Sequence, residues 1–227
     1  MPLLLTTHPF PESTFGLWQV LETEAFFRDQ LRLSPVEENE LAKYQLALRR
    51  REWLAVRWLV HLLSDQPVRL PLTKDTFAKP FFPDDAGQIC SLSHSQGLVG
   101  ALLAKKESGA VGCDLQVLVD KMPRLAPRFL NPVEMEFVGQ QTLADQFDLV
   151  HLLWTAKESL YKAYGIKELD FRAHLQVAPF SWDGYAATTT GTIVKNDFRQ
   201  AFQLWMEKKE LPDGTTYVWT VCQFVSS

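Results

Sequence analysis

The residues best suited to chemistry lie between Trp154 and Gly165, where a carboxylate stands between two lysines. Glu158 precedes Lys162 by four residues, so on a helix both side chains project from the same side. A carboxylate with neighbouring lysines can bind a metal ion together with a polyphosphate. The same residue types also form solvated ion pairs on ordinary helices, so this motif alone leaves both interpretations open.

A helix is the element that must position these groups. Residues 145–164 contain no Gly or Pro, and their apolar residues recur at steps of three and four. Gly165 stands where a residue in the left-handed conformation commonly ends a helix. The sequence therefore predicts a helix that ends at Tyr164 and carries Glu158 near its C-terminal end.

A second carboxylate, Asp114, lies in the strand-like segment 109–116. Alternation along a strand places Asp114 and Gln116 on one face of the sheet and Cys113 on the other. Magnesium sites in proteins commonly use one or two carboxylates together with phosphate oxygens. Asp114 and Glu158 could therefore hold Mg²⁺ beside a pyrophosphate.

Groups that suit phosphate come earlier in the chain. The apolar segment 89–92 leads into Ser93-His94-Ser95, where hydroxyls, an imidazole and turn N–H groups can cradle a phosphate. Lys79 precedes Pro80, which holds the chain extended around this cation. We expect these residues to contribute to a phosphate site.

The four elements together resemble the 4′-phosphopantetheinyl transferase superfamily, in particular its monomeric, two-lobed, surfactin-synthetase-activating type. Members of this family show Lys-Pro, Ser-His-Ser, Gly-hydrophobe-Asp-hydrophobe-Glu and Trp-x-x-Lys-Glu-Ser-x-x-Lys, in that order. The corresponding elements here are residues 79–80, 93–95, 112–116 and 154–162. The resemblance extends from about Ser34 to about Val177.

The resemblance implies an enzyme that moves the 4′-phosphopantetheine arm of coenzyme A to a serine of an apo acyl, peptidyl or polyketide carrier protein. It implies Mg²⁺ as cofactor and 3′,5′-ADP as the released product. Positioning and charge neutralisation dominate the rates of phosphoryl-type transfers. This is why lysines, a histidine and carboxylates would be needed around one ligand.

The resemblance also implies which side chains act. Asp114, Glu158 and Gln116 would bind Mg²⁺, and Lys162 would take part in catalysis with Glu158 by holding the pyrophosphate. The side chains implied to contact coenzyme A come from both halves of the chain: Arg51, Lys79, Ser93, His94, Lys157 and Lys162.

Glu134 has two interpretations that do not exclude one another. It follows the run Arg128-Phe129-Leu130, where the family places a glutamate, and the resemblance implies that it is the general base. The local sequence also favours a capping box, with Asn131 as N-cap, Pro132 in the first turn and Glu134 at the third position.

Two features depart from the family pattern. Gln116 stands where a second acidic residue is usual, and the segment Ser34–Glu40 is acidic where lysines are common. Among the arginines at 49–51 we expect Arg51 to reach the nucleotide and the other two to be solvated. The departures keep open a catalytically weak coenzyme A-binding module, and Asp114, Glu158 and His94 would also suit a metal-dependent phosphohydrolase.

Composition excludes some classes of partner but does not indicate a function. The chain has 227 residues, 46% of them hydrophobic, and a net charge of −4, so it has no overall basic field for nucleic acid or an anionic membrane. The three cysteines show no metal-binding spacing, and the N-terminus has no basic region before its short apolar run. We therefore expect a cytoplasmic protein with reduced thiols.

The pattern of elements predicts an α+β fold. We expect one helix over residues 35–64, short helices from 123 and the long helix to 164. We expect strands over residues 89–93, 98–105, 110–116, 171–177, 188–194, 201–207 and 217–224. The order of a helix followed by strands occurs twice. Together with the resemblance, this predicts two similar lobes, 1–108 and 109–227, related by a pseudo-two-fold with the active site between them.

Overall fold

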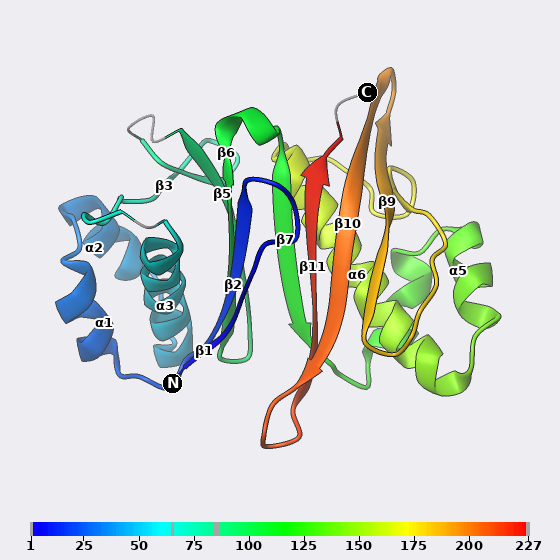
Figure 1. Ribbon diagram of the computed structural model, residues 1–227, viewed down its shortest axis with the longest axis horizontal. Helices are drawn as coiled ribbons and strands as arrows, with labels where there is room; N and C mark the ends of the chain where they lie inside the picture. Colours follow the sequence, from blue (N-terminus) through cyan, green and yellow to red (C-terminus); the bar gives the residue numbers. More distant parts are fainter. Residues whose placement is uncertain (1, 65, 84–86, 226–227) are drawn as a thin grey trace. The chain divides into compact units, whose positions relative to one another are not determined.

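The computed structural model describes residues 2–64, 66–83 and 87–225 (Figure 1). Residues 1, 65, 84–86, 226 and 227, which fall within the predicted lobes 1–108 and 109–227, lie outside the described residues. The chain divides into two compact units, Met1–Glu107 and Ser108–Ser227. Both combine helices with antiparallel strands, which confirms the predicted α+β class. The pseudo-two-fold stays a prediction.

The first unit is a four-stranded antiparallel sheet in the order β1-β2-β6-β5, covered by helices. Helix α3 packs against β2, β5 and β6, and α1 packs against α3 (Figure 1). Its elements are β1 (Leu3–Thr7), β2 (Ser13–Gln19), α1 (Glu24–Leu31), α2 (Pro35–Leu41), α3 (Ala47–Leu63), β3 (Thr73–Lys74), β4 (Pro80–Phe81), β5 (Gln88–Ser95) and β6 (Leu98–Lys105).

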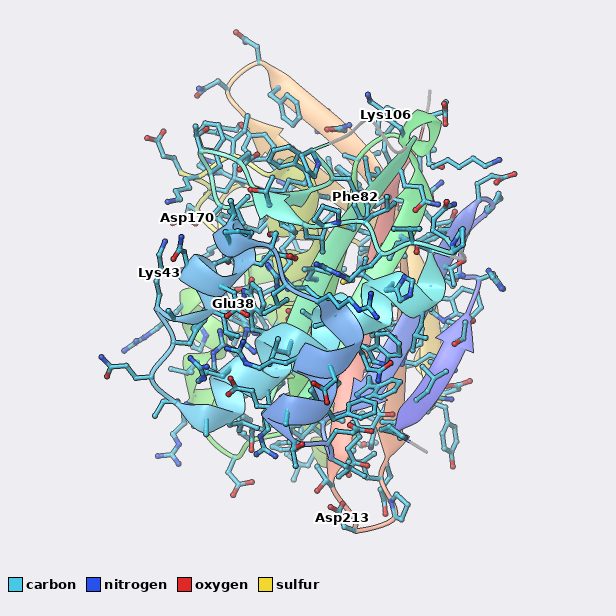
Figure 2. All side chains as sticks on the ribbon, turned by 90° about the vertical axis from the view of Figure 1, so that its left-hand side faces the viewer. Glu38, Lys43, Phe82, Lys106, Asp170 and Asp213 are labelled. Atoms are coloured by element: carbon cyan, nitrogen blue, oxygen red, sulfur yellow. The ribbon has the colours of Figure 1, made fainter. Side chains whose placement is uncertain are left out.

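The single helix predicted for residues 35–64 is wrong, because the chain breaks between α2 and α3. No Gly or Pro marks the break in the sequence. The guanidinium of Arg50 instead donates to the carbonyl oxygens of Leu41 and Tyr44, at 3.2 and 3.4 Å, and so satisfies carbonyls at the end of α2. Arg28 of α1 also pairs with Glu38 of α2 at 2.6 Å; Figure 2 labels Glu38 among these helices. A tertiary contact therefore sets this boundary.

The second unit is a five-stranded antiparallel sheet in the order β7-β11-β10-β9-β8, with α6 packed against it (Figure 1). Its core is formed by apolar residues of α6 and of the strands beneath it. Its elements are β7 (Val111–Val117), α4 (Met122–Leu125), α5 (Pro132–Gly139), α6 (Leu143–Tyr164), β8 (Leu175–Val177), β9 (Ala186–Lys195), β10 (Phe198–Glu210) and β11 (Thr216–Phe224).

Local signals predicted two boundaries of this unit correctly. Helix α6 ends at Tyr164, and Gly165 follows with a φ of 73°, the left-handed conformation that favours glycine. The turn between β10 and β11 contains Asp213, labelled at the tip of the hairpin in Figure 2, and Gly214 with a φ of 83°. The carboxylate of Asp213 accepts a hydrogen bond from the Thr215 N–H at 2.9 Å.

The predicted strand 171–177 is too long, because only Leu175–Val177 pairs with β9. The carboxylate of Asp170 accepts hydrogen bonds from the N–H groups of Arg172 and Ala173, at 2.8 and 2.7 Å. Such side-chain capping favours a turn over an extended strand. Within the described ranges, no helix is long and apolar enough to cross a membrane.

Candidate functional site

The position of Asp114 depends on a close approach between strand β7 and helix α6. A Cβ atom added to Gly112 would lie 1.9 Å from the backbone oxygen of Ser159. No larger residue fits there without moving the helix. Gly112 thus allows the backbone of β7 to lie directly against α6, two residues before the carboxylate of Asp114.

Asp114, Glu158 and Lys162 come together at this contact, and we call them the Asp114 cluster. The ammonium of Lys162 donates to Asp114 Oδ1 at 2.7 Å and to the backbone oxygen of Cys113 at 2.9 Å. Burial disfavours the charged ammonium, but the charge and hydrogen bond of Asp114, together with the neighbouring Cys113 and Glu158, outweigh this effect and raise the pKa of Lys162. The structure thus places Asp114 and Glu158, which we expected to act together, in one cluster with Lys162.

Glu158 titrates near neutrality in this arrangement. Burial raises the pKa of Glu158 to about 7, and the charge of Asp114 adds to this effect while Lys162 opposes it. A carboxylate that is costly to ionise beside another carboxylate would be stabilised by a divalent cation. Two carboxylates also match the oxygen donors that Mg²⁺ takes from proteins. The residues of the Asp114 cluster therefore fit the metal implied by the sequence.

The third predicted metal ligand, Gln116, lies two residues farther along β7. Its amide nitrogen donates to the backbone oxygen of Val117 at 2.7 Å. Over the described part of the chain, no group of three or more His, Cys, Asp or Glu side chains is placed to hold a metal ion. A site here would draw its charge from Asp114 and Glu158, and ligation by Gln116 stays a prediction.

Glu134 and Lys157 form a separate, fully buried ion pair. Lys157 Nζ lies 2.7 Å from Glu134 Oε2, and the two side chains are 0% and 1% exposed. The ammonium also donates to the backbone oxygens of Phe129, Phe171 and Leu175, each at 2.8 Å. These contacts tie α6 to the segments before α5 and around β8.

The remaining contacts of Glu134 are structural as well. Glu134 and Asn131 form the predicted capping box of α5, with hydrogen bonds of 2.8 and 2.9 Å, so this interpretation is confirmed. Its other oxygen accepts the Val177 N–H at 3.0 Å. With both oxygens occupied by protein donors, the geometry supports packing roles for Glu134 and Lys157, and the predicted base and coenzyme contacts stay predictions.

Two further residues of the 154–162 motif pack rather than face the Asp114 cluster. The Trp154 ring stacks on Phe171 with ring centroids 5.5 Å apart and meets Phe129 edge-on at 5.0 Å. The hydroxyl of Ser159 donates to the backbone oxygen of Thr220 at 3.0 Å, which joins α6 to β11. The motif therefore holds the helix in place through these side chains and presents Glu158 and Lys162.

Within the first unit, a cavity of about 200 Å³ contains the predicted phosphate residues Ser93 and His94. We call it the His94 pocket. Cationic side chains outnumber acidic ones around it, which suits an anion. Its lining residues come from α3, from β5 and from the segment before it: Tyr44, Arg49, Glu52, Trp53, Val56, Arg57, Lys74, Ala78, Pro80, Leu92, Ser93 and His94.

Arg49 lines this pocket beside His94, and Arg57 lines it as well, whereas we expected Arg51. A guanidinium nitrogen of Arg49 contacts the His94 imidazole. Lys79 lies between two lining residues, and its backbone N–H donates to the Asp75 carboxylate at 2.9 Å. Sequence reasoning also missed Glu52. Its signal is the spacing of three residues after Arg49, which places the two side chains together on one side of α3.

Comparisons with known proteins identify a family for the second unit. The family model of the 4′-phosphopantetheinyl transferase superfamily matches residues 110–222, a range that includes the whole Asp114 cluster. A Synechocystis sp. protein with the provisional name 4′-phosphopantetheinyl transferase is 28% identical over 156 residues. The alignment covers 66% of this chain and 59% of that relative's length. Through residues 110–222, the chain therefore belongs to the 4′-phosphopantetheinyl transferase superfamily.

Proposed function

We propose that this protein transfers the 4′-phosphopantetheine arm of coenzyme A to a serine of an apo carrier protein. The observation that carries the proposal is the Asp114 cluster: two carboxylates and a lysine brought together by the approach of β7 and α6. The family match supports phosphopantetheinyl transfer in general. The carrier substrate, Mg²⁺, the release of 3′,5′-ADP and the surfactin-synthetase-activating type belong to the proposal.

In this proposal the His94 pocket and the Asp114 cluster recognise different phosphate groups of coenzyme A. The His94 pocket would take a phosphate of the nucleotide, because Arg49 and His94 are both accessible there. The pyrophosphate would bind at Lys162, which carries the positive charge of the Asp114 cluster. Asp114 and Glu158 would hold Mg²⁺, and the bound ion would neutralise charge on the pyrophosphate.

In the proposed reaction, the main task of this chain is to stabilise the charge that develops in the transition state. The carrier serine oxygen forms a bond to the phosphorus of the pantetheine arm, and the bond to the departing 3′,5′-ADP breaks. Negative charge builds on the leaving phosphate, and the Lys162 ammonium is held in place to stabilise it by two acceptors, Asp114 and the Cys113 carbonyl. The proposal does not require Glu134 as the base, because its carboxylate is engaged by Lys157.

The partner and the compartment are proposals of the same kind. A carrier protein is typically acidic near its serine, and Lys121, Arg124 and Arg128, between β7 and α5, offer positive charge for docking. The three cysteines are buried thiols, which agrees with a reducing cytoplasm.

Intact-protein mass spectrometry tests the proposed function. Apo acyl and peptidyl carrier proteins would be incubated with this chain, coenzyme A and Mg²⁺, with and without a chelator. We expect a mass gain of one phosphopantetheine arm that is lost with the chelator and in Glu158→Gln. Coenzyme A binding without any mass gain would support a binding module instead. Hydrolysis of coenzyme A in the absence of carrier would support a phosphohydrolase.

A further inference from the structure

The His94 pocket contains one buried acid among its cations. Glu52 lies on α3, and its side chain is 3% exposed, whereas the side chains of Arg49 and His94 are 37% and 45% exposed. The two cationic groups therefore face solvent, and the carboxylate lies beneath them. An acid in this place weakens an anion site by its charge alone, so its presence needs a physical reason.

Glu52 contacts both cationic groups through one oxygen. Glu52 Oε2 lies 3.0 Å from Arg49 Nη1 and 3.4 Å from His94 Nδ1. Arg49 and a protonated His94 repel each other when they stand alone in contact. A carboxylate that accepts from both offsets this repulsion and limits the rotamers available to each side chain.

The other oxygen of Glu52 anchors the carboxylate to the backbone. Glu52 Oε1 accepts the Gly97 N–H at 2.8 Å, in the turn between β5 and β6. Gln96 and Gly97 have φ values of 47° and 84°, so this is a tight hairpin turn, and His94 stands just before it on β5. Glu52 is thereby fixed relative to both α3 and the strand that carries His94.

We propose that Glu52 is the positioning residue of the His94 pocket, holding Arg49 and His94 side by side so that both bind one phosphate monoester. This inference rests on the proposed function for the identity of the ligand, coenzyme A. Glu52 does not touch the phosphate itself. Its role is to keep two mutually repelling donors together in the geometry that the anion needs.

Calorimetric binding of coenzyme A to Glu52→Gln tests the proposal. Glutamine keeps the shape and can still accept from Gly97, but it lacks the charge that holds Arg49 and His94. We expect binding to weaken about tenfold or more, the equivalent of losing one charge-assisted contact. Dephospho-coenzyme A, which lacks the 3′-phosphate monoester, should bind wild type and variant alike. Unchanged or tighter binding of coenzyme A by the variant would overturn the proposal.

A matched control separates positioning from stability. Glu24 is a partly buried acid of the same unit, bonded to Arg28 at 2.9 Å and to Arg50 at 2.8 and 2.5 Å, and neither it nor these partners line the His94 pocket. Glu24→Gln should therefore keep coenzyme A affinity wherever it stays folded. An equal loss of affinity in Glu24→Gln and Glu52→Gln would show a general effect of removing an acid paired with arginine.

The titration of His94, followed by NMR, gives a readout of the Glu52 contact that a loss of stability alone would not move. The charged groups that line the pocket with its ring are Arg49, Glu52 and Arg57 of α3 and Lys74 of β3. Removing the carboxylate leaves cations around the ring, so the pKa of His94 should fall in Glu52→Gln. An unchanged pKa would refute the positioning role even if coenzyme A proved not to be the ligand. Failure of wild type to bind coenzyme A would instead refute the proposed function.

Discussion

Replacing Lys157 by methionine is the sharpest test of the role that the structure assigns to this residue. The ammonium makes four contacts of 2.7–2.8 Å, to Glu134 and to three backbone carbonyls, and no part of the side chain is exposed. Methionine fills a similar volume but leaves a buried carboxylate without its counter-ion. Breaking a buried pair in this way costs about 3–5 kcal/mol.

Urea unfolding of wild type and Lys157→Met, followed by far-UV circular dichroism, measures this loss. Because the chain has two units, hydrogen exchange of the peptides around Asn131 and Val177 would localise the effect. The double change with Glu134→Gln should recover part of the free energy of unfolding, since the unpaired charge is gone. The exposed Lys167 provides a control, and Lys167→Met should change stability by less than about 0.5 kcal/mol.

One result would refute this reasoning. If Lys157→Met unfolds like wild type but no longer binds coenzyme A, then Lys157 contacts the ligand and the buried pair is not its function. The coenzyme contact inferred from the family motif would then be correct. A large loss of stability, with transfer activity in proportion to the folded fraction, supports the packing role.

Three further predictions concern the second unit. Gly112→Ala should destabilise the protein by about 1–3 kcal/mol and abolish transfer, because its Cβ would lie 1.9 Å from a backbone oxygen of α6. Thermal unfolding measures the loss of stability, and the carrier assay measures the loss of transfer. Gln116→Glu should lower the Mg²⁺ concentration needed for half-maximal transfer, and an unchanged Mg²⁺ titration would place residue 116 away from the metal. Burial lowers the pKa of His151, and the hydrogen bond that its Nδ1 donates to Phe147 O offsets only part of this effect. Its Nε2 accepts the Val119 N–H, a bond that protonation of the ring would break. Below about pH 6.5 the unfolded chain therefore binds more protons than the folded chain, so the free energy of unfolding of wild type should fall as the pH drops below that value. In His151→Gln it should fall much less. Urea unfolding at several pH values measures the difference.

The sequence predicted the second unit better than the first because its signals are local. Helix α6 has an unbroken apolar repeat and a glycine at its end, and the β10–β11 turn has Asp213-Gly214. The break between α2 and α3 carries no such signal, since it depends on Arg50 reaching carbonyls of a neighbouring turn. Strand β2 was not predicted because nearly all of its residues are buried, so it lacks the alternation of a half-buried strand, and it contains Gly16, which weakens strand propensity.

The site residues that the sequence predicts are those whose residue type and order along the chain indicate chemistry. The residues that it does not predict are those whose role depends on whether the side chain is buried. Asp114, Glu158 and Lys162 were identified by residue type and order along the chain, and the structure brings them together. Whether a charged residue faces a ligand or the core cannot be judged from its type. Arg49, rather than Arg51, lines the His94 pocket because of the rotation of α3.

The 154–162 motif shows why one stretch can serve both packing and chemistry. Successive residues of a helix are rotated by about 100°, so Lys157 and Glu158 leave α6 in different directions. Lys157 enters the core and joins α6 to Glu134, while Glu158 and Lys162 face Asp114 on β7. The packing residues thereby fix the helix against the sheet, and the reacting charges depend on that fixed distance. A substitution at Lys157 should thus impair catalysis through the position of α6, and restoring stability elsewhere should restore activity.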